Sequence, residues 1–176
     1  MSITEQESVS LDFFKPEYTA LLEDYDLHDS QKKYTAMPLE ALIMCKMDRE
    51  RHPVVIFYGN ELAGFFVLHG REGAKEFSDN KDAILLRAYS VNATFQGKGI
   101  AKKSMSLLPS FVRKHFPTKN EIILAVNHAN EIAQKVYLNG GFIDKGIRAL
   151  GREGEMFILH LNLFAESKGI RISICE

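Results

Sequence analysis

The sequence lacks several features that mark large classes of protein. Its two cysteines, Cys45 and Cys175, are too few for a disulfide framework and form no Cys-x-x-Cys pair, so we expect a reducing, cytoplasmic environment. The polar, acidic start has no basic segment followed by an apolar one, which argues against a signal peptide. Apolar runs stay far below the ~18–20 residues that span a bilayer, so we expect no membrane partner.

The chain also has little net charge and no cluster of metal-ligand type. Lysine and arginine number 22 against 23 aspartates and glutamates. Nucleic-acid-binding proteins usually carry a basic excess, so we expect no nucleic-acid partner. The overall charge does not exclude a local basic patch. The six histidines show no metal-binding spacing, so no metal site is expected. The length of 176 residues, with 45% hydrophobic and 26% charged residues, is typical of one soluble globular domain.

Hydrophobic patterning predicts strands alternating with helices. Strands are expected over 9–14, 53–58, 62–69, 83–91, 121–126, 142–148 and 156–163. Helices are expected from Lys15-Pro16 onward and over 38–47, 101–115 and 130–139, with a kink or break at Pro109 and a loop over 70–81. This order indicates an α/β fold, a mixed sheet with helices on both faces.

The end of the chain is set apart from this pattern. We expect a single domain over 1–163 and a C-terminal extension over 164–176. In the segment 169–175, isoleucines alternate with polar residues. Such a segment is either an added edge strand or a contact between two subunits, so a homodimer is possible.

A glycine-rich turn, Gln96-Gly97-Lys98-Gly99-Ile100-Ala101, lies between a predicted buried strand and an amphipathic helix. The first turn of a helix presents unpaired N–H groups and the positive end of its dipole, which together can hold a phosphate. Lys98, Lys102 and Lys103 add positive charge. The turn matches neither Gly-x-Gly-x-x-Gly nor Gly-x-x-x-x-Gly-Lys-[Ser/Thr]. The alternative is a tight strand-to-helix connection with no ligand.

Two blocks of residues carry a resemblance to a known family. Gln96-x-x-Gly99-x-Ala101 resembles the pyrophosphate-binding loop of the GNAT superfamily of acyl-CoA N-acyltransferases. Downstream, Asn130, Ala133 and Tyr137 on one predicted helix, followed by Gly141-Phe142, are similar to the second signature of that family. The resemblance covers about residues 84–142. It implies a mixed, mostly antiparallel central sheet with helices on both faces, and acetyl-CoA as co-substrate.

The resemblance also implies a role for each matching residue. Backbone amides of the turn from Gln96 to Ala101 would hold the pyrophosphate of coenzyme A, with charge from Lys98 and Lys102. The strand before the turn would splay from the strand over 121–126, and its backbone would face the pantetheine arm and the acyl carbonyl. Tyr137 would be the general acid for the leaving thiolate. The implied cofactor-binding residues are Tyr89, Ser90, Val91, Gln96, Gly97, Lys98, Gly99, Ile100, Ala101, Lys102, Asn130 and Ala133.

Simpler interpretations of the same residues stay open. Tyr137 could be a half-buried core tyrosine, Asn130 a helix N-cap, and the lysines solvated surface. The strand before the turn carries no carboxylate between Ala83 and Gln96, so the general base is unassigned. Either an ordered water or a carboxylate from the N-terminal helices is expected to take the amine proton.

The sequence therefore predicts an N-acetyltransferase that moves an acetyl group from acetyl-CoA to a primary amine by direct attack. The alternatives are a non-catalytic acyl-CoA sensor and another nucleotide-binding α/β protein. One feature of the sequence indicates the chemical class of the acceptor. It is an acidic run that contains no lysine or arginine and would attract a cationic amine. A solvated acidic loop explains it equally well. The run consists of Glu17, Glu23, Asp24, Asp26 and Asp29.

Overall fold

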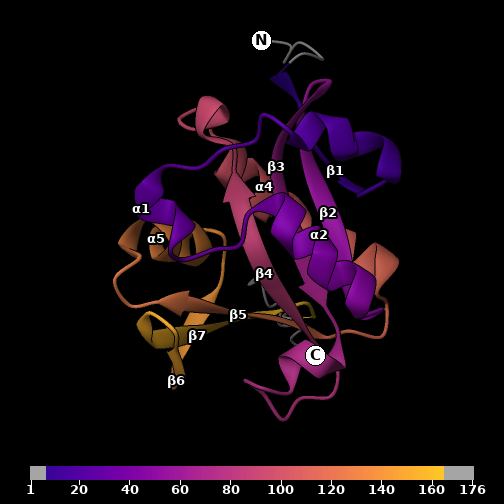
Figure 1. Ribbon diagram of the computed structural model, residues 1–176. Helices are drawn as coiled ribbons and strands as arrows, with labels where there is room; N and C mark the ends of the chain where they lie inside the picture. Colours follow the sequence, from indigo (N-terminus) through magenta and orange to yellow (C-terminus); the bar gives the residue numbers. More distant parts are fainter. Residues whose placement is uncertain (1–6, 165–176) are drawn as a thin grey trace, which may run out of the picture.

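The computed structural model describes residues 7–164, which build one seven-stranded sheet (Figure 1). The strands lie in the order β1-β2-β3-β4-β5-β7-β6, and β4 and β5 are the one parallel pair in this sheet. This confirms the expected mixed, mostly antiparallel sheet. The strands are β1 (Val9–Phe13), β2 (Arg51–Tyr58), β3 (Glu61–His69), β4 (Ala83–Val91), β5 (Glu121–Asn127), β6 (Ile143–Gly151) and β7 (Gly154–Asn162).

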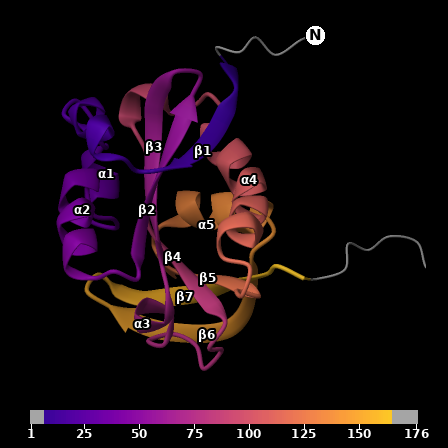
Figure 2. The same ribbon diagram turned by 90° about the vertical axis from the view of Figure 1, so that its right-hand side faces the viewer.

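Helices cover both faces of the sheet, as Figure 2 shows. One face carries the 3₁₀ helix η2 (Pro16–Leu22) and the helices α1 (Asp29–Lys32) and α2 (Pro38–Met47). The other carries α4 (Ile100–His115) and α5 (Glu131–Asn139). Two short elements complete the chain, α3 (Arg71–Ala74) after β3 and the 3₁₀ turn η3 (Ala93–Phe95) after β4.

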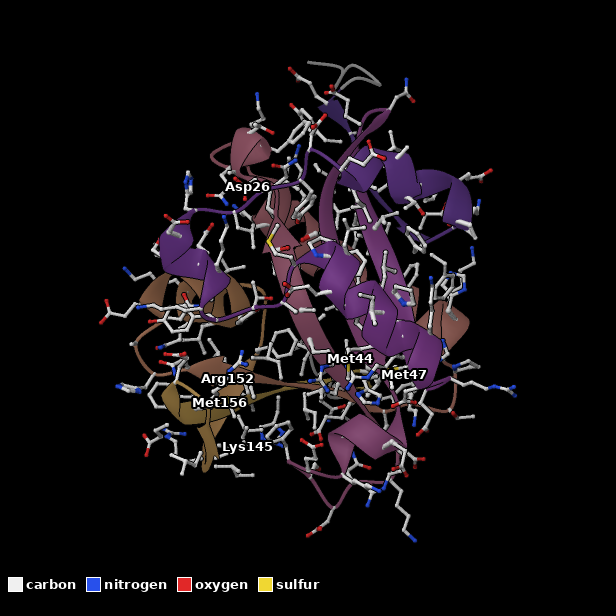
Figure 3. The ribbon with its side chains drawn as sticks, viewed as in Figure 1. Asp26, Met44, Met47, Lys145, Arg152 and Met156 are labelled. Atoms are coloured by element: carbon white, nitrogen blue, oxygen red, sulfur yellow. The ribbon has the colours of Figure 1, made fainter. Side chains whose placement is uncertain are left out.

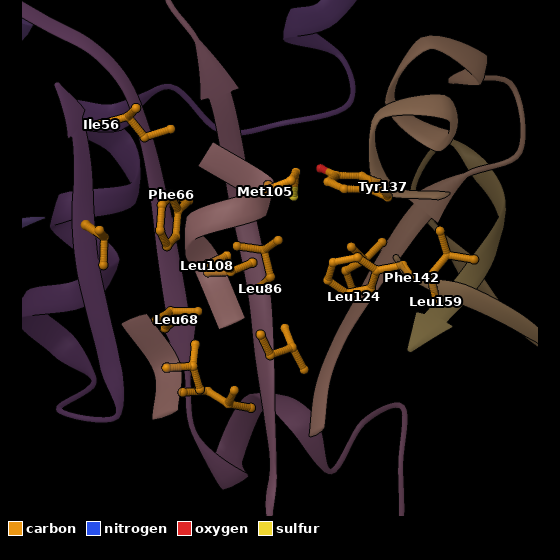
Figure 4. Packing of buried hydrophobic residues seen from close by; sticks show 14 of the residues in the cluster. Ile56, Phe66, Leu68, Leu86, Met105, Leu108, Leu124, Tyr137, Phe142 and Leu159 are labelled. Atoms are coloured by element: carbon orange, nitrogen blue, oxygen red, sulfur yellow. The ribbon is translucent and has the colours of Figure 1, made fainter. Parts of the chain in front are cut away.

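Alternation along the strands divides the core between the two faces. Val54 and Ile56 of β2 join the cluster under α4 and α5, while Val55 joins the cluster under α2. Successive side chains of a strand point to opposite faces, so one β-branched run can fill both layers. Figure 4 shows the α4–α5 side of this core, with Met105 and Leu108 of α4 among its members.

Three elements differ in detail from the expected ones. The helix predicted from Lys15-Pro16 is 3₁₀ rather than α, and the predicted loop over 70–81 contains α3. Helix α4 continues through Pro109 without a break. Proline removes one backbone hydrogen bond, but Leu108 and Val112 of the same helix are fully buried, and that packing keeps the helix continuous. The segment 169–175 lies outside the described residues.

The parallel pair β4 and β5 separates part-way along its length. Pairing runs from Ala83 opposite Glu121 to Leu85 opposite Ile123 and then stops, although both strands continue. Figure 1 shows the two strands diverging from their lower ends. The unpaired part of β4 therefore presents a free backbone edge to the space between the strands.

A β-bulge interrupts β4 where this free edge begins. Phe65 pairs with Ser90 and Val67 pairs with Arg87, so Ala88 and Tyr89 together face Phe66. Ala88 has a φ of 53°, the one positive value among the described residues that are not glycine. The extra residue resets the alternation of β4, placing Tyr89 and Val91 in the α4–α5 cluster and Ala88 against the α2 cluster.

Within residues 7–164, no helix has the length and apolar character that crossing a bilayer requires.

Candidate functional site

A cleft of about 910 Å³ occupies the opening between β4 and β5. It is also bounded by the segment from α1 to α2, by Arg152 of the turn between β6 and β7 and by Met156 of β7, both labelled in Figure 3. Lys98 and Lys102, both exposed, do not line it. The other residues expected at the site do: Tyr89, Ser90, Val91, Gln96, Gly97, Gly99, Ile100, Ala101, Asn130, Ala133 and Tyr137.

The glycine-rich turn offers a row of free backbone donors to this cleft. Gly97 and Gly99 have φ values of 81° and 75°, in the left-handed region that glycine adopts without strain. An added Cβ at either position would meet nothing within 4 Å, so backbone conformation rather than crowding favours glycine. Within the described residues, the N–H groups of residues 97–102 have no hydrogen-bond acceptor. Such a set at the start of α4 is suited to an anion.

Gln96 makes hydrogen bonds within the protein through both its backbone and its side chain. Its N–H group donates to the Ala93 carbonyl at 3.4 Å, so this amide is not among the free donors. Its side-chain amide donates to the Val91 carbonyl at 2.9 Å and to Gln31 Oε1 at 3.0 Å. Gln96 therefore ties the turn to the end of β4 and to α1. Gln96 also lines the cleft, and its contact with the pyrophosphate stays a prediction.

The free edge of β4 presents one well-defined donor at Val91. The Asn92 N–H donates to the Ala63 carbonyl at 2.8 Å, and Val91 lies opposite Gly64. In an antiparallel ladder this makes Val91 and Gly64 a non-hydrogen-bonded pair, so the Val91 N–H points away from β3. Since β5 has already diverged, that N–H group points into the cleft.

Tyr137 brings an unpartnered hydroxyl to the same cleft. Its side chain extends from α5 toward Met105 of α4 (Figure 4), and the residue is 9% exposed. Among the described residues its hydroxyl has no hydrogen-bond partner. Burial raises the pKa of Tyr137 above the ordinary phenol value, because the phenolate would lose hydration. The group is therefore protonated at neutral pH.

The neighbouring Tyr89 is differently placed. Its ring meets the Tyr137 ring edge-on, with centroids 6.0 Å apart, but its hydroxyl lies 2.6 Å from Ser104 Oγ. Ser104 Oγ donates to the Ala101 carbonyl at 2.9 Å, so Tyr89 is the donor in the pair with Ser104. Burial raises the pKa of Tyr89 to about 12. Of these two tyrosines, Tyr137 is the one with a proton free for a ligand.

Comparison with known proteins agrees with this geometry. Residues 12–142 match the model of the Acetyltransferase (GNAT) family. The chain belongs to this family. A relative from Bacillus subtilis (strain 168), the uncharacterized N-acetyltransferase YbbJ, is 44% identical over 155 residues, covering 88% of this chain and 97% of the relative. The GNAT protein described here is accordingly an acyltransferase.

Solved structures share the fold of this GNAT acyltransferase. The aminoglycoside acetyltransferase AAC(6')-Ib in complex with coenzyme A and kanamycin superposes with a TM-score of 0.71 at 18% identity. The spermidine N-acetyltransferase from Vibrio cholerae in complex with CoA and spermine superposes with a TM-score of 0.59 at 16% identity. Each match covers 88% of this chain and 95% of the other.

Asn130 caps α5 and keeps its side-chain NH₂ group unpaired among the described residues. Its Oδ1 accepts from the Ala133 N–H at 3.4 Å, which caps α5. Its side-chain NH₂ group has no partner among the described residues, and Asn130 lines the cleft. The cap thus leaves the amide donor of this acyltransferase free for a ligand such as the pantetheine arm.

Replacing Asn130 separates these two roles. Asn130→Asp keeps a capping oxygen and loses the NH₂ donor, so we expect unchanged unfolding free energy and coenzyme A affinity weakened roughly 3- to 10-fold. Asn130→Ala loses both, so stability falls by about 1 kcal/mol as well. Urea denaturation and calorimetric titration with coenzyme A measure the two effects. Full affinity in Asn130→Asp would leave capping as the sole role.

The carboxylates of the cleft differ from those expected. Glu131 at the start of α5 and Glu153 in the β6–β7 turn line it. The N-terminal helices contribute no carboxylate to the lining, and none of the acidic run over 17–29 reaches it. Asp26 instead pairs with Lys32 at 3.0 Å. Among residues 7–164, no cluster of histidine, cysteine, aspartate and glutamate is suited to a metal.

Arg87 is a site residue that the sequence analysis missed. It lies on β4 just before the bulge and lines the cleft. The sequence did contain a signal: Arg87 is a charged residue in a predicted buried strand, next to Leu85, Leu86 and Ala88. Charged side chains are rarely buried unless they are paired or functional.

Proposed function

We propose that this protein transfers the acetyl group of acetyl-CoA to a primary amine by direct attack, with no covalent enzyme intermediate. The observation that carries the proposal is the meeting of three features in one cleft. These are the free N–H row of residues 97–102, the inward Val91 N–H and the unpartnered Tyr137 hydroxyl. The family match and the acetyltransferases of the same fold support it.

The acyl donor is acetyl-CoA, and the turn sets its direction in the cleft. The N–H row of residues 97–102 binds the pyrophosphate, and the pantetheine arm follows the free edge of β4 from Val91 toward Tyr89. The arm completes hydrogen bonds that β5 does not supply there. Because Tyr137 stacks edge-on against Tyr89, the thioester sulfur comes to lie beside the Tyr137 hydroxyl.

The reaction then needs few protein groups. The amine nitrogen bonds to the thioester carbonyl carbon, and a backbone N–H on the free edge of β4 stabilises the oxyanion that forms. As the carbon–sulfur bond breaks, Tyr137 donates its proton to the departing thiolate and regains one from solvent. We assign the amine proton to water: the N-terminal helices place no carboxylate in the cleft, and Glu131 and Glu153, which also line it, are given no role in this step.

The test is turnover with a panel of primary amines. Purified protein is incubated with acetyl-CoA and each amine, released thiol is followed with a chromogenic disulfide, and the acetylated product is weighed by mass spectrometry. We expect thiol release with stoichiometric amide formation. Binding of coenzyme A without turnover across the panel would instead favour the sensor, and displacement of coenzyme A by NAD or ATP would favour another nucleotide-binding protein.

A further inference from the structure

A half-buried arginine lies beside the predicted position of the thioester. Arg87 is separated from Tyr89 by the single residue Ala88, so it lies about 7 Å along β4 from the tyrosine that contacts Tyr137. It is on the side of Tyr89 away from the glycine-rich turn. The backbone of Arg87 is therefore near the reacting end of the acyl donor, and its guanidinium extends to His69 on the α2 side of the sheet, opposite to the Tyr89 ring, where it lines the cleft.

A chain of hydrogen bonds holds Arg87 in place. Arg87 Nη1 donates to His69 Nδ1 at 3.1 Å, and His69 Nε2 donates to Asp48 Oδ2 at 2.8 Å. Asp48 in turn accepts from the Glu50 N–H at 2.9 Å. His69 is 3% exposed, and burial lowers its pKa, so the ring is neutral and its Nδ1 is an acceptor. This tautomer is the one that the Asp48 contact selects.

The rest of the Arg87 guanidinium is uncommitted. No carboxylate lies within 4.0 Å of it among the described residues, and its Nε and Nη2 make no hydrogen bond there. Arg51 Nε is buried without a hydrogen-bond partner, whereas no atom of Arg87 is in that state. Asp48 and Glu76 act on Arg87 at longer range, while Arg51 opposes them. A charge that is half removed from water with free donors favours an anionic ligand.

The charges that line the cleft also favour an anionic ligand. Its basic lining residues are Lys33, Arg87 and Arg152, against the two carboxylates of Glu131 and Glu153. The acidic run that would attract a polycation lies outside the lining. The planar fork of an arginine matches the two oxygens of a carboxylate better than a single oxygen or a neutral amide.

We propose that Arg87 is a carboxylate-binding subsite next to the reacting thioester. The inference rests on the proposed acetyl transfer and names the chemistry of a substrate. The carboxylate belongs either to the acceptor, an amine that also carries a carboxyl group, or to the acyl chain, as in a dicarboxylic acyl-CoA. Either source would place its anion against the free face of the guanidinium while His69 holds the opposite nitrogen.

Two arms of one experiment distinguish these sources. In the acceptor arm, amino acids are compared with their carboxamides, with acetyl-CoA as donor and at equal concentrations of unprotonated amine. In the acyl arm, succinyl-CoA is compared with butyryl-CoA, with a neutral amine as acceptor. We expect the carboxylate member to be preferred in one arm, and Arg87→Gln to raise its KM roughly 10- to 100-fold. The neutral member should change by about twofold or less.

The preference must depend on Arg87 itself. Arg87→Lys keeps the charge without the fork and should fall between the wild type and Arg87→Gln. Circular dichroism and thermal unfolding show whether each variant is folded. No preference in either arm, or an equal loss for the charged and neutral members, would overturn the subsite.

His69 provides a matched pair of variants for a positioning role. In His69→Asn the Oδ1 atom stands near the place of Nδ1 and still accepts from Arg87, whereas His69→Gln keeps the contact with Asp48 and loses that acceptor. We expect His69→Gln to raise KM for the carboxylate substrate several-fold with kcat little changed, and His69→Asn to do so less. Equal effects on the neutral substrate would indicate a structural role instead.

A binding measurement separates this inference from the proposed function. The coenzyme A complex is titrated calorimetrically with each amino acid and its carboxamide, and the free protein with succinyl-CoA and butyryl-CoA. Tighter binding of a carboxylate member, lost in Arg87→Gln, supports the subsite even if no amine is acetylated. Equal binding throughout overturns the subsite while leaving acetyl transfer to be judged by thiol release.

Discussion

Gly99→Asp is expected to weaken coenzyme A binding by about 100-fold or more. Gly99 has a φ of 75°, a conformation that aspartate tolerates better than most residues, and its added Cβ would meet nothing within 4 Å. The chain should therefore still fold. The new carboxylate would stand among the free N–H groups of residues 97–102 and repel the pyrophosphate, and like charges in contact cost several kcal/mol. Calorimetric titration with coenzyme A measures the loss.

Gly99→Asn is the matched control for this substitution. Asparagine has nearly the same shape as aspartate and is also tolerated at positive φ, but it carries no charge. We expect its affinity for coenzyme A to fall about tenfold or less, through the side chain's bulk near the backbone. Wild-type affinity in Gly99→Asp would mean that the turn is a strand-to-helix connection and that coenzyme A binds elsewhere.

The strands were predictable because their signal is local. The run Pro53–Tyr58 is dense in β-branched and aromatic residues, and the structure confirms it as part of β2. The run Ala83–Val91, with its apolar start, is confirmed as β4. The short helices α1 and α3 have four residues each, too few to show a helical period. The continuity of α4 through Pro109 depends on packing against the sheet, which the helix sequence alone does not contain.

Much of the candidate site was predictable for a related reason. The N–H row of residues 97–102 follows from one glycine-rich turn at the start of a helix, and Tyr137 follows from a second block within one helix. Each depends on residues that are neighbours in sequence. The separation of β4 from β5, which brings the two blocks to one cleft, was expected from the family resemblance and is present in the structure.

The interactions that sequence reasoning missed join distant segments. Arg87, His69 and Asp48 come from β4, the end of β3 and the end of α2, and Gln96 meets Gln31 of α1. Arg87 meets His69 because β3 and β4 pair, with Val67 opposite Arg87 and His69 opposite Leu85. The acidic run shows the converse, since its charges are close in sequence but do not line the cleft. The sequence shows which residues are charged, but only the tertiary structure shows which of those side chains line the cleft.

Tyr137→Phe is expected to lower kcat roughly 100- to 10,000-fold, the contribution typical of a positioned general acid. Coenzyme A affinity should change by about twofold or less, because the ring remains and the hydroxyl has no partner among the described residues. The unfolding free energy should change little, since the hydroxyl borders the cleft and has no partner to lose among the described residues. Steady-state kinetics, calorimetric titration and urea denaturation measure the three quantities.

Tyr25→Phe is the control that makes this result specific, and pH gives a second check. Tyr25 is 5% exposed and lies outside the cleft lining, and its hydroxyl is 2.7 Å from Ser90 Oγ. Its loss should cost about 1 kcal/mol of stability and leave kcat within about threefold, the reverse of the Tyr137 pattern. Because burial raises the pKa of Tyr137, the acid form persists, and wild-type kcat should show no alkaline decline below about pH 10. A kcat retained in Tyr137→Phe would remove the general acid from this mechanism.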